Sequence, residues 1–346
     1  MVKFNKIKSL VLNWNLDKVL ILSGITLSVF IIAFFVWWRS GVILIENPND
    51  GEAMSKLNKS SISGISCENY NRRPVSVMMA ADPETRPLSG IGEADIVFEM
   101  PVTPNGITRF MAVFQCTEPK EIGSIRSARS DFIPLASGLG SIYAHWGGER
   151  EALEKLNNHI AENIDAMKYE GTVFYRKKNV PMPHNGFTDI GKILEQAKKL
   201  GYSLNNSFEC YPHDEKEIKK NISNLAEEIL IDYLSPYNVK WIYDKQKNEY
   251  KRFRSNQPEI DKNTDEQVWA KVVAVLRTTS KYLSKDYISV NTQGGGDGVV
   301  YQGGIAIPVK WQKDAGKLDS KLYFYDSSNK EIKFLPGQIW VEILTD

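Results

Sequence analysis

The sequence is poor in cysteine and histidine and carries almost no net charge. Of its 346 residues three are cysteine and four are histidine, and the formal net charge is +1. Without a broad positive field or a stripe of lysines among aromatic residues, nucleic-acid binding is disfavoured. The histidines show no His-x-His or His-Glu-x-x-His spacing, so we expect no metal and no cofactor. No Gly-x-Ser-x-Gly nucleophile elbow occurs either, which leaves acyl chemistry without support.

Long apolar runs are scarce as well, with one exception near the N-terminus. Residues 19–38 contain no charge and no proline over 20 positions, enough for a helix to cross the hydrocarbon core of about 30 Å. The charged residues among 1–18 are four lysines and one aspartate, whereas Arg39 is almost the only basic residue close behind the run. This bias places the N-terminal tail in the cytoplasm and residues 39–346 outside the cell membrane. We predict a single-pass transmembrane anchor at 19–38, with a cleaved signal peptide as the alternative.

The three cysteines limit the export route and the crosslinks. A lipid-anchored export signal needs a cysteine directly after the apolar run, and the first cysteine is Cys67. Outside the cytosol a disulfide persists. Cys67 precedes the first expected strand and Cys116 ends an apolar strand, so we predict a bond between them, with Cys210 as the spare thiol. Three unrelated thiols are the alternative, because sequence alone does not give connectivity.

The remaining chain divides by its hydrophobic periodicity. Residues 39–66 are polar and aperiodic, which predicts a linker. Residues 67–225 predict an α/β domain and residues 226–346 a mostly β domain, both behind the single N-terminal transmembrane helix. The expected helices are 131–139, 149–157 and 189–200, and the expected strands are 75–80, 94–100, 107–116, 141–144, 229–233, 239–243, 250–253, 268–276, 298–301, 305–309, 322–325 and 338–344. The glycine run 294–298 predicts a flexible hairpin connection, since no Lys-Ser/Thr of a phosphate loop follows it.

Three arginines are candidates for a binding site. Arg126 and Arg129 are three residues apart, so a helical turn would put them on one face where they can grip one anion, with the hydroxyl of Ser127 beside them. Arg109 begins an otherwise apolar strand, where its charge needs a partner. The alternative is structural, with Arg126 and Arg129 bridging acidic residues and Arg109 pairing with Glu99. The acidic candidates are Glu93, Asp95 and Glu99.

Two histidines are the further candidates. His145 ends a buried strand shortly before two glycines, which let a ligand approach the backbone. His184 lies in a proline-bounded loop with the amide of Asn185 beside it. Such a pair can act as acid and base. The structural alternative is that each histidine is a satisfied hydrogen-bonding group.

Several short motifs occur in order along the exported part. They are NRRPV (71–75), RPLSG (86–90), EADIV (93–97), GITR (106–109), IGSIRSAR (122–129), HWGG (145–148) and PHN (183–185). In this order they resemble the DUF3048 family of YerB-like lipoproteins. The GGGDG run (294–298), Trp311 and LPGQIW (335–340) look like the second, C-terminal domain of that family. The resemblance implies a membrane-tethered extracytoplasmic protein of two domains, and it implies no particular reaction.

The preferred hypothesis is a cell-envelope protein that binds an anionic ligand or an envelope partner in an Arg/His-lined cleft. The predicted cleft residues are Arg109, Arg126, Ser127, Arg129, His145, His184 and Asn185. The alternative is a hydrolase of an envelope phosphodiester or glycan, with His145 and His184 as acid and base. A third hypothesis, a scaffold for wall-synthesis proteins, predicts internally paired charges and an exposed apolar patch instead.

Overall fold

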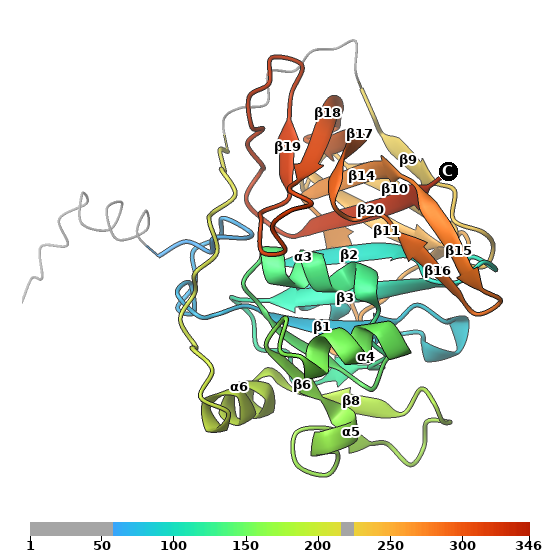
Figure 1. The fold of residues 1–346 in the computed structure, drawn as a ribbon. Coiled ribbons are helices and arrows are strands. Elements are labelled where there is room, and N and C mark those ends of the chain that lie inside the picture. Colours follow the sequence, from blue (N-terminus) through green and yellow to red (C-terminus); the bar gives the residue numbers. More distant parts are fainter. Residues whose placement is uncertain (1–57, 216–224) are drawn as a thin grey trace, which may run out of the picture. The chain divides into compact units, whose positions relative to one another are not determined.

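One sheet of ten strands runs through the part of the chain that the computed structural model describes, residues 58–215 and 225–346 (Figure 1). In spatial order its strands are β19 (Tyr323–Tyr325), β18 (Ile305–Lys313), β17 (Gly294–Gln302), β14 (Val272–Thr278), β20 (Ile339–Thr345), β2 (Ile96–Pro101), β3 (Thr108–Phe114), β1 (Val75–Ala80), β5 (Ile142–His145) and β6 (Asn163–Asp165). The last strand of the chain, β20, is parallel to both of its neighbours, β14 and β2. Strands from both sides of the predicted boundary at 225–226 therefore share one sheet.

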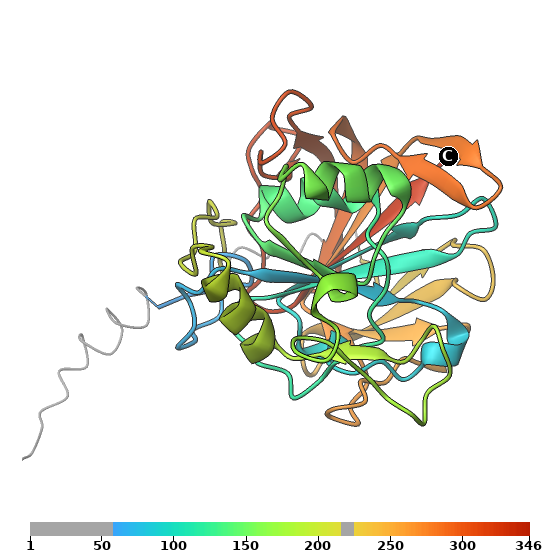
Figure 2. The same cartoon turned by 60° about the horizontal axis from the view of Figure 1, so that its bottom comes forward.

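The centre of the sheet is covered on both faces. Every residue of β1 is buried, as expected for a near-continuous apolar run in a central strand. Helical segments η3 (Ser130–Phe132), α3 (Ile133–Gly138) and α4 (Arg150–Asn157) bury their apolar residues on one face. The other face is covered by α6 (Ile190–Lys199) and a smaller sheet (Figure 2).

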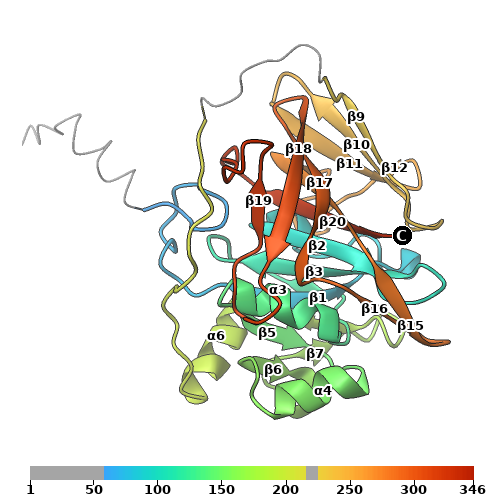
Figure 3. The same cartoon turned by 45° about the horizontal axis from the view of Figure 1, so that its top comes forward.

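The smaller elements surround this core. The second sheet has the order β12 (Gln257–Pro258), β11 (Glu249–Arg254), β10 (Val239–Asp244) and β9 (Glu228–Ile231), with β13 (Trp269–Ala270) also paired to β11. A hairpin of β15 (Ser280–Ser284) and β16 (Tyr287–Val290) projects at one side (Figure 3). The remaining elements are β4 (Ile122–Gly123), β7 (Tyr175–Arg176), β8 (Gly186–Thr188), α5 (Ala166–Tyr169), η1 (Pro83–Thr85) and η2 (Ile91–Glu93).

The fold has a mixed α/β N-terminal region and a mostly β C-terminal region, as predicted. The predicted strand 75–80 is β1, and the predicted helix 189–200 is α6. Asp189 caps α6 by accepting a hydrogen bond from Lys192 N at 2.9 Å. Gly201 follows the helix with a φ of +78°, the left-handed conformation that favours glycine at this position.

The prediction for Gly294–Gly298 is wrong, because these glycines belong to β17. The connection between β17 and β18 is made by Gly303 and Gly304, whose φ angles are +61° and +78°. A Cβ atom on Gly296 would lie 2.6 Å from the indole nitrogen of Trp311. At this position the glycine therefore makes room for an aromatic ring on the neighbouring strand.

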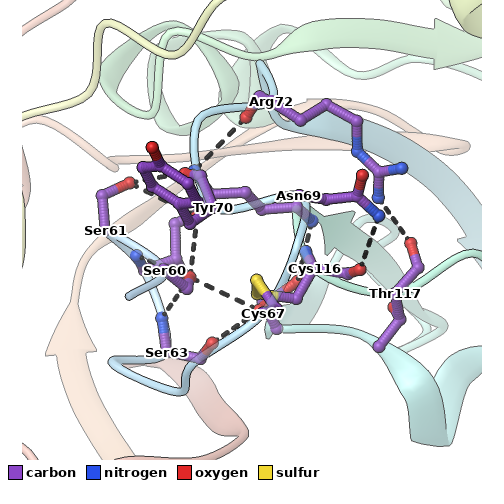
Figure 4. The surroundings of a disulfide bond; sticks show 12 residues. Ser60, Ser61, Ser63, Cys67, Asn69, Tyr70, Arg72, Cys116 and Thr117 are labelled. Carbon is purple, nitrogen blue, oxygen red and sulfur yellow. Dashed lines mark hydrogen bonds between the residues drawn. A yellow bond between two sulfur atoms is a disulfide. The ribbon is translucent and has the colours of Figure 1, made fainter. Parts of the chain in front are cut away.

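The predicted disulfide between Cys67 and Cys116 is confirmed (Figure 4). Cys210 is a free, exposed thiol. The bond joins residues 49 positions apart in sequence. Around it Ser60 Oγ donates to Gln115 Oε1 at 2.7 Å. The disulfide and this hydrogen bond hold residues 58–67 to Gln115 and Cys116, which directly follow β3.

The predicted linker 39–66 is shorter than expected at its C-terminal end. Ser60, Ile62 and Ser63 are fully or almost fully buried, and Ser63 Oγ donates to Asp95 Oδ1 at 2.5 Å. The predicted cytoplasmic tail 1–18 and transmembrane segment 19–38 lie outside the described residues. Within residues 58–215 and 225–346, the structure has no helix long and apolar enough to cross a membrane.

Candidate functional site

The segment 124–129 is extended and completes one edge of β1. The first half of β1 pairs with β5, and its second half pairs with this segment. Ala80 N donates to Ser124 O at 3.0 Å, and Arg126 N donates to Met78 O at 2.9 Å. The prediction of a helical turn here is wrong, because the backbone groups are used between strands instead.

The second half of this segment bonds to the loop that follows β5. Trp146 N donates to Arg126 O at 3.0 Å, and Ala128 N donates to Gly147 O at 2.9 Å. Gly147 N in turn donates to Asp165 Oδ1, after β6, at 2.8 Å. The segment thus lies at the carboxyl ends of the parallel strands β1, β5 and β6, the edge where open α/β sheets place their ligands.

Strand alternation puts two of the candidate arginines on one face of the sheet. Ile125 packs in the core on the side of α6, whereas Met111 packs on the side of α3 and α4. Arg126 adjoins Ile125 and Arg109 lies two residues from Met111, so both side chains lie on the side of α3 and α4. Arg129 is close enough to repel both electrostatically. We call Arg109, Arg126 and Arg129 the three-arginine cluster.

Arg109 is the most buried member of the cluster, with 4% of its surface exposed. Its guanidinium donates to Ser127 O at 3.2 Å, and its Nε is buried without a hydrogen-bond partner. Among the described residues no carboxylate lies within 4 Å of it. Burial, together with repulsion from Arg129 and Arg126, lowers the pKa of Arg109 to about 9. The site therefore holds a positive charge that the local residues do not neutralise.

The alternative partner, Glu99, is used elsewhere. Glu99 accepts hydrogen bonds from Thr108, Arg252 and Arg254, and all four residues are buried. These contacts tie β2 to β11 of the smaller sheet. Alternation along β3 puts Thr108 and Arg109 on opposite faces, which is why Glu99 does not pair with Arg109.

Arg126 and Arg129 each have a carboxylate at long range only. Arg126 Nε is 3.9 Å from Asp82 Oδ2, and Arg129 Nε is 3.9 Å from Glu149 Oε2. Neither arginine bridges the acidic residues considered from the sequence. With both carboxylates counted, the three guanidinium groups leave a local excess of one positive charge.

Unpartnered polar atoms concentrate around the cluster. Within the described part of the chain, the buried side-chain atoms without a hydrogen-bond partner include the Nε atoms of Arg109, Arg126 and Arg129, the Oγ atoms of Ser124 and Ser130, Tyr143 OH and Asp82 Oδ2. Burial raises the pKa of Tyr143, so its hydroxyl stays protonated and is able to donate. Buried polar groups are normally satisfied by protein, water or ligand. This concentration makes the cluster and its surroundings the candidate site among the described residues.

His145 is buried at the end of β5, and its ring contacts other groups of the protein. Its ring is fully buried, with Nδ1 2.8 Å from Gly147 O and Nε2 3.3 Å from Asn163 Oδ1. Burial lowers the pKa of His145 despite Asp165, whose Oδ1 is 3.8 Å from Nδ1. Both ring nitrogens are therefore engaged in holding the loop after β5. Among the described residues no group of three His, Cys, Asp or Glu side chains is arranged to hold a metal.

The loop with His184 touches the cluster through its backbone. Arg126 donates to Pro183 O at 3.4 Å, while His184 is half-buried with Nδ1 unpartnered. The next side chain, Asn185, accepts a hydrogen bond from Arg176 at 2.9 Å. The structure thus gathers Arg109, Arg126, Ser127 and Arg129, places this loop at their rim, and uses the amide of Asn185 elsewhere.

Three residues of the site escaped the sequence analysis. Asp82 lies two residues after β1, and its position close to the end of a buried strand was a usable signal. Tyr143 looked like an ordinary apolar residue of its strand. The ring of Tyr287, in β16, lies 5.1 Å from the Arg129 guanidinium. Nothing in the sequence connects Tyr287 with residue 129, because only tertiary packing brings them together.

Comparisons with known proteins agree on one family. Residues 62–203 match the model described as "Protein of unknown function (DUF3048) N-terminal domain", and residues 229–341 match that of the DUF3048 C-terminal domain. The "Putative lipoprotein YerB" of Bacillus subtilis (strain 168) is 28% identical over 302 residues, 84% of this chain and 88% of that protein. The crystal structure of Bacillus subtilis YerB superposes with a TM-score of 0.74 at 27% identity, covering 83% of this chain and 97% of that one.

Proposed function

Because this chain belongs to the DUF3048 family, in which its similarity to YerB extends over both domains, we propose that it is a membrane-attached extracytoplasmic protein that binds an anionic ligand through Arg109, Arg126 and Arg129. The local excess of positive charge and the unpartnered donors support the binding role. Ser127 supports it through its carbonyl, which holds Arg109 in place.

Membrane attachment is supported by the relative and by this chain's own sequence. The relative carries the name "Putative lipoprotein YerB", and a lipid anchor holds a protein at a membrane surface. Here the sulfur of Cys67 is taken up by the disulfide with Cys116 and is not available for lipidation. The apolar residues 19–38 are the proposed anchor instead, in a single-pass arrangement with residues 39–346 outside.

The observation that carries the binding proposal is the environment of Arg109. A guanidinium keeps its charge, and burying it without a carboxylate is costly unless something else compensates. Its nearest charged neighbours include two further arginines, which raise that cost. A bound anion would offset the free-energy cost of burying Arg109 and the repulsion among the three guanidinium groups. A purely structural role for Arg109 would leave both costs in place.

The hydrolase alternative receives no comparable support. An acid–base pair must reach the reacting atoms, and His145 is fully buried with both nitrogens engaged. The scaffold hypothesis expects the arginines to be internally paired, and among the described residues Arg109 lacks a carboxylate within 4 Å. An envelope partner that presents an acidic group remains compatible with the proposed site.

Calorimetric titration of the full chain in detergent with sulfate and with inorganic phosphate tests the proposal. Replacing Arg126 or Arg129 with Ala should weaken binding by roughly 2 to 5 kcal/mol. Lysine at either position should recover only part of this loss, because it restores the charge without the planar fork. Arg150→Ala is the matched control, since this arginine on α4 is 92% exposed and should leave binding unchanged.

The same variants show whether the arginines are structural. If the unmodified chain binds neither anion, and if Arg126→Ala and Arg129→Ala lower the melting temperature strongly while Arg150→Ala does not, the arginines are braces and the proposal is wrong.

A further inference from the structure

A polar cavity adjoins the three-arginine cluster. It has a volume of about 510 Å³ and lies between η3, α4 and the hairpin of β15 and β16. Its lining includes Ser130, Asp131, Lys155, Lys281, Asn291 and Thr292. Small-molecule sites commonly have volumes of about 300 to 1,000 Å³. This cavity has the size of such a site, but hydroxyl, amide and charged groups replace the usual apolar lining.

Ser130 connects the cavity to the cluster. It directly follows Arg129, lines the cavity, and has a buried Oγ without a hydrogen-bond partner among the described residues. Tyr287 belongs to β16, the strand that supplies Ser289 and Val290 to the lining, and its ring centre lies 5.1 Å from the Arg129 guanidinium. The cluster and the cavity are therefore connected through the consecutive residues Arg129 and Ser130 and through strand β16.

The hairpin wall is held in place by Asp131. Its Oδ2 accepts from Val290 N at 2.7 Å, and its Oδ1 accepts from Ser289 Oγ at 3.1 Å. The backbone carbonyl of the same residue accepts from Thr292 Oγ1 at 2.8 Å. These bonds are internal to the protein, so the cavity is preformed rather than assembled around a ligand.

Other groups of the lining are free to bind. Asn291 is exposed, and in the described part of the chain its side-chain NH₂ donates to no protein acceptor. Lys281 is exposed as well and has no ion-pair partner among the described residues. Amide and ammonium groups are hydrogen-bond donors for hydroxyl and ether oxygens. Such a lining suits a polyhydroxylated group and not an acyl chain.

The donors of the cluster favour phosphate over carboxylate. Three Nε atoms and the hydroxyls of Ser124, Ser130 and Tyr143 are buried and unpartnered. A carboxylate has two oxygens, whereas a phosphoryl group presents at least three strong acceptors in a tetrahedral arrangement. More of these donors are satisfied by the larger anion.

We infer that the ligand is a phosphorylated sugar or polyol, with its phosphate on the three-arginine cluster and its hydroxyl groups in the adjoining cavity. This inference rests on the proposed function and adds the chemical class of the ligand. A free sugar phosphate and a phosphodiester-linked polymer share this chemistry. The juxtaposition of Arg129, Ser130 and the cavity carries the inference.

Titration of the full chain in detergent with four probes tests it: inorganic phosphate, glycerol 3-phosphate, glucose 1-phosphate and glucose. At least one of the two phosphorylated probes should bind ten-fold or more tightly than inorganic phosphate, and glucose should not bind measurably. One hydrogen bond contributes about 0.5 to 1.5 kcal/mol. Asn291→Ala should therefore lower the affinity for that phosphorylated probe roughly three-fold to ten-fold and leave the affinity for inorganic phosphate unchanged. Asn105→Ala is the matched control, an exposed asparagine on the loop between β2 and β3.

The outcomes separate this inference from the function on which it rests. If inorganic phosphate binds and neither phosphorylated probe binds more tightly, the inference is wrong and the anion site stands. If Asn291→Ala leaves the affinity for a tighter-binding probe unchanged, the hydroxyl groups of that probe do not occupy this cavity. If no probe binds the unmodified chain, the proposed function and the inference both fail. If a phosphorylated probe does bind more tightly, a further titration with a polymer of glycerol phosphate units distinguishes a free ligand from a polymeric one.

Discussion

Arg109 is a buried guanidinium whose charged neighbours include two more guanidinium groups. The free-energy cost of burying this charge is electrostatic and local, so a single substitution at Arg109 should remove it. Arg109→Met keeps most of the side-chain length and removes the charge. Replacing buried charges by apolar groups of similar volume is often neutral or stabilising.

We expect Arg109→Met to raise the free energy of unfolding by about 1 kcal/mol and to abolish anion binding. Chemical denaturation and calorimetric titration with sulfate measure the two effects on the same protein. A loss of stability together with unchanged sulfate binding would show that Arg109 acts as a structural brace through Ser127.

Arg252 shows the opposite behaviour, because its charge is fully compensated. It contacts Glu99, Glu259 and Glu342 in a network where all four side chains are almost fully buried. Although burial opposes ionisation, Arg254 and Arg252 hold the pKa of Glu259 at about 2. The network joins β2 and β20 to β11 of the smaller sheet.

Arg252→Ala should therefore lower the free energy of unfolding by about 3 to 5 kcal/mol, because it leaves buried carboxylates unpaired. The control is Arg277→Ala, whose side chain is 62% exposed and 3.9 Å from Asp346, and we expect a change within about 0.5 kcal/mol. Denaturant titrations of the two variants give the comparison. Equal effects would mean that the buried network contributes nothing specific.

At the scale of elements, Asp131 joins η3 to β16. Burial raises the pKa of this carboxyl from 3.8 to about 6, against the hydrogen bonds from Val290 and Ser289, and Glu149 adds to the rise while Lys155 opposes it. Since the folded state binds this proton more tightly than the unfolded state, protonation stabilises the fold. The gain accumulates as the pH falls from about 7 to about 4.

We expect the stability difference between the unmodified protein and Asp131→Asn to shift by up to roughly 3 kcal/mol in favour of the unmodified protein over that pH range. Asp286→Asn, at the exposed turn of the same hairpin, is the matched control and should show little pH dependence. Denaturant titrations at several pH values provide the measurement. A constant difference for Asp131→Asn would mean that its carboxyl is not raised in pKa.

At the scale of the whole molecule, the disulfide and the proposed topology belong together. The proposed topology places residues 39–346 outside the membrane, in a compartment where a bond such as that between Cys67 and Cys116 persists. Protease added to intact cells, with the wall made permeable, should digest residues 39–346 and spare an epitope placed within residues 1–18. Immunoblotting of both ends measures this. Protection of the outer part would show that the lysine bias was misinterpreted.

Periodicity and local chemistry were enough to predict individual elements. The apolar run 75–80 is β1, and the amphipathic pattern with Asp189 and Gly201 at its ends is α6. These features depend on residues close in sequence, so they can be predicted without the tertiary structure. The disulfide was also predicted, from the position of Cys67 before the first expected strand and of Cys116 at the end of an apolar strand.

The candidate site was only partly accessible to such analysis. Arg109, Arg126 and Arg129 were identified as its cations, but the helical turn assigned to 126–129 and the pairing of Arg109 with Glu99 were wrong. Both errors come from the sheet: β1 offers an open edge that the segment completes, and β3 sends Thr108 and Arg109 to opposite faces. Neither fact is local in sequence.

The sequence by itself determined most of the element types, the arginines of the cluster and the apolar segment near the N-terminus, because each follows from the residue itself or from its close neighbours. Only the tertiary structure decided that β20 inserts between β14 and β2, that Tyr287 stacks on Arg129, and that a polar cavity opens beside Ser130. Those contacts join residues far apart along the chain. Their geometry depends on strand order and side-chain packing, which no local pattern specifies.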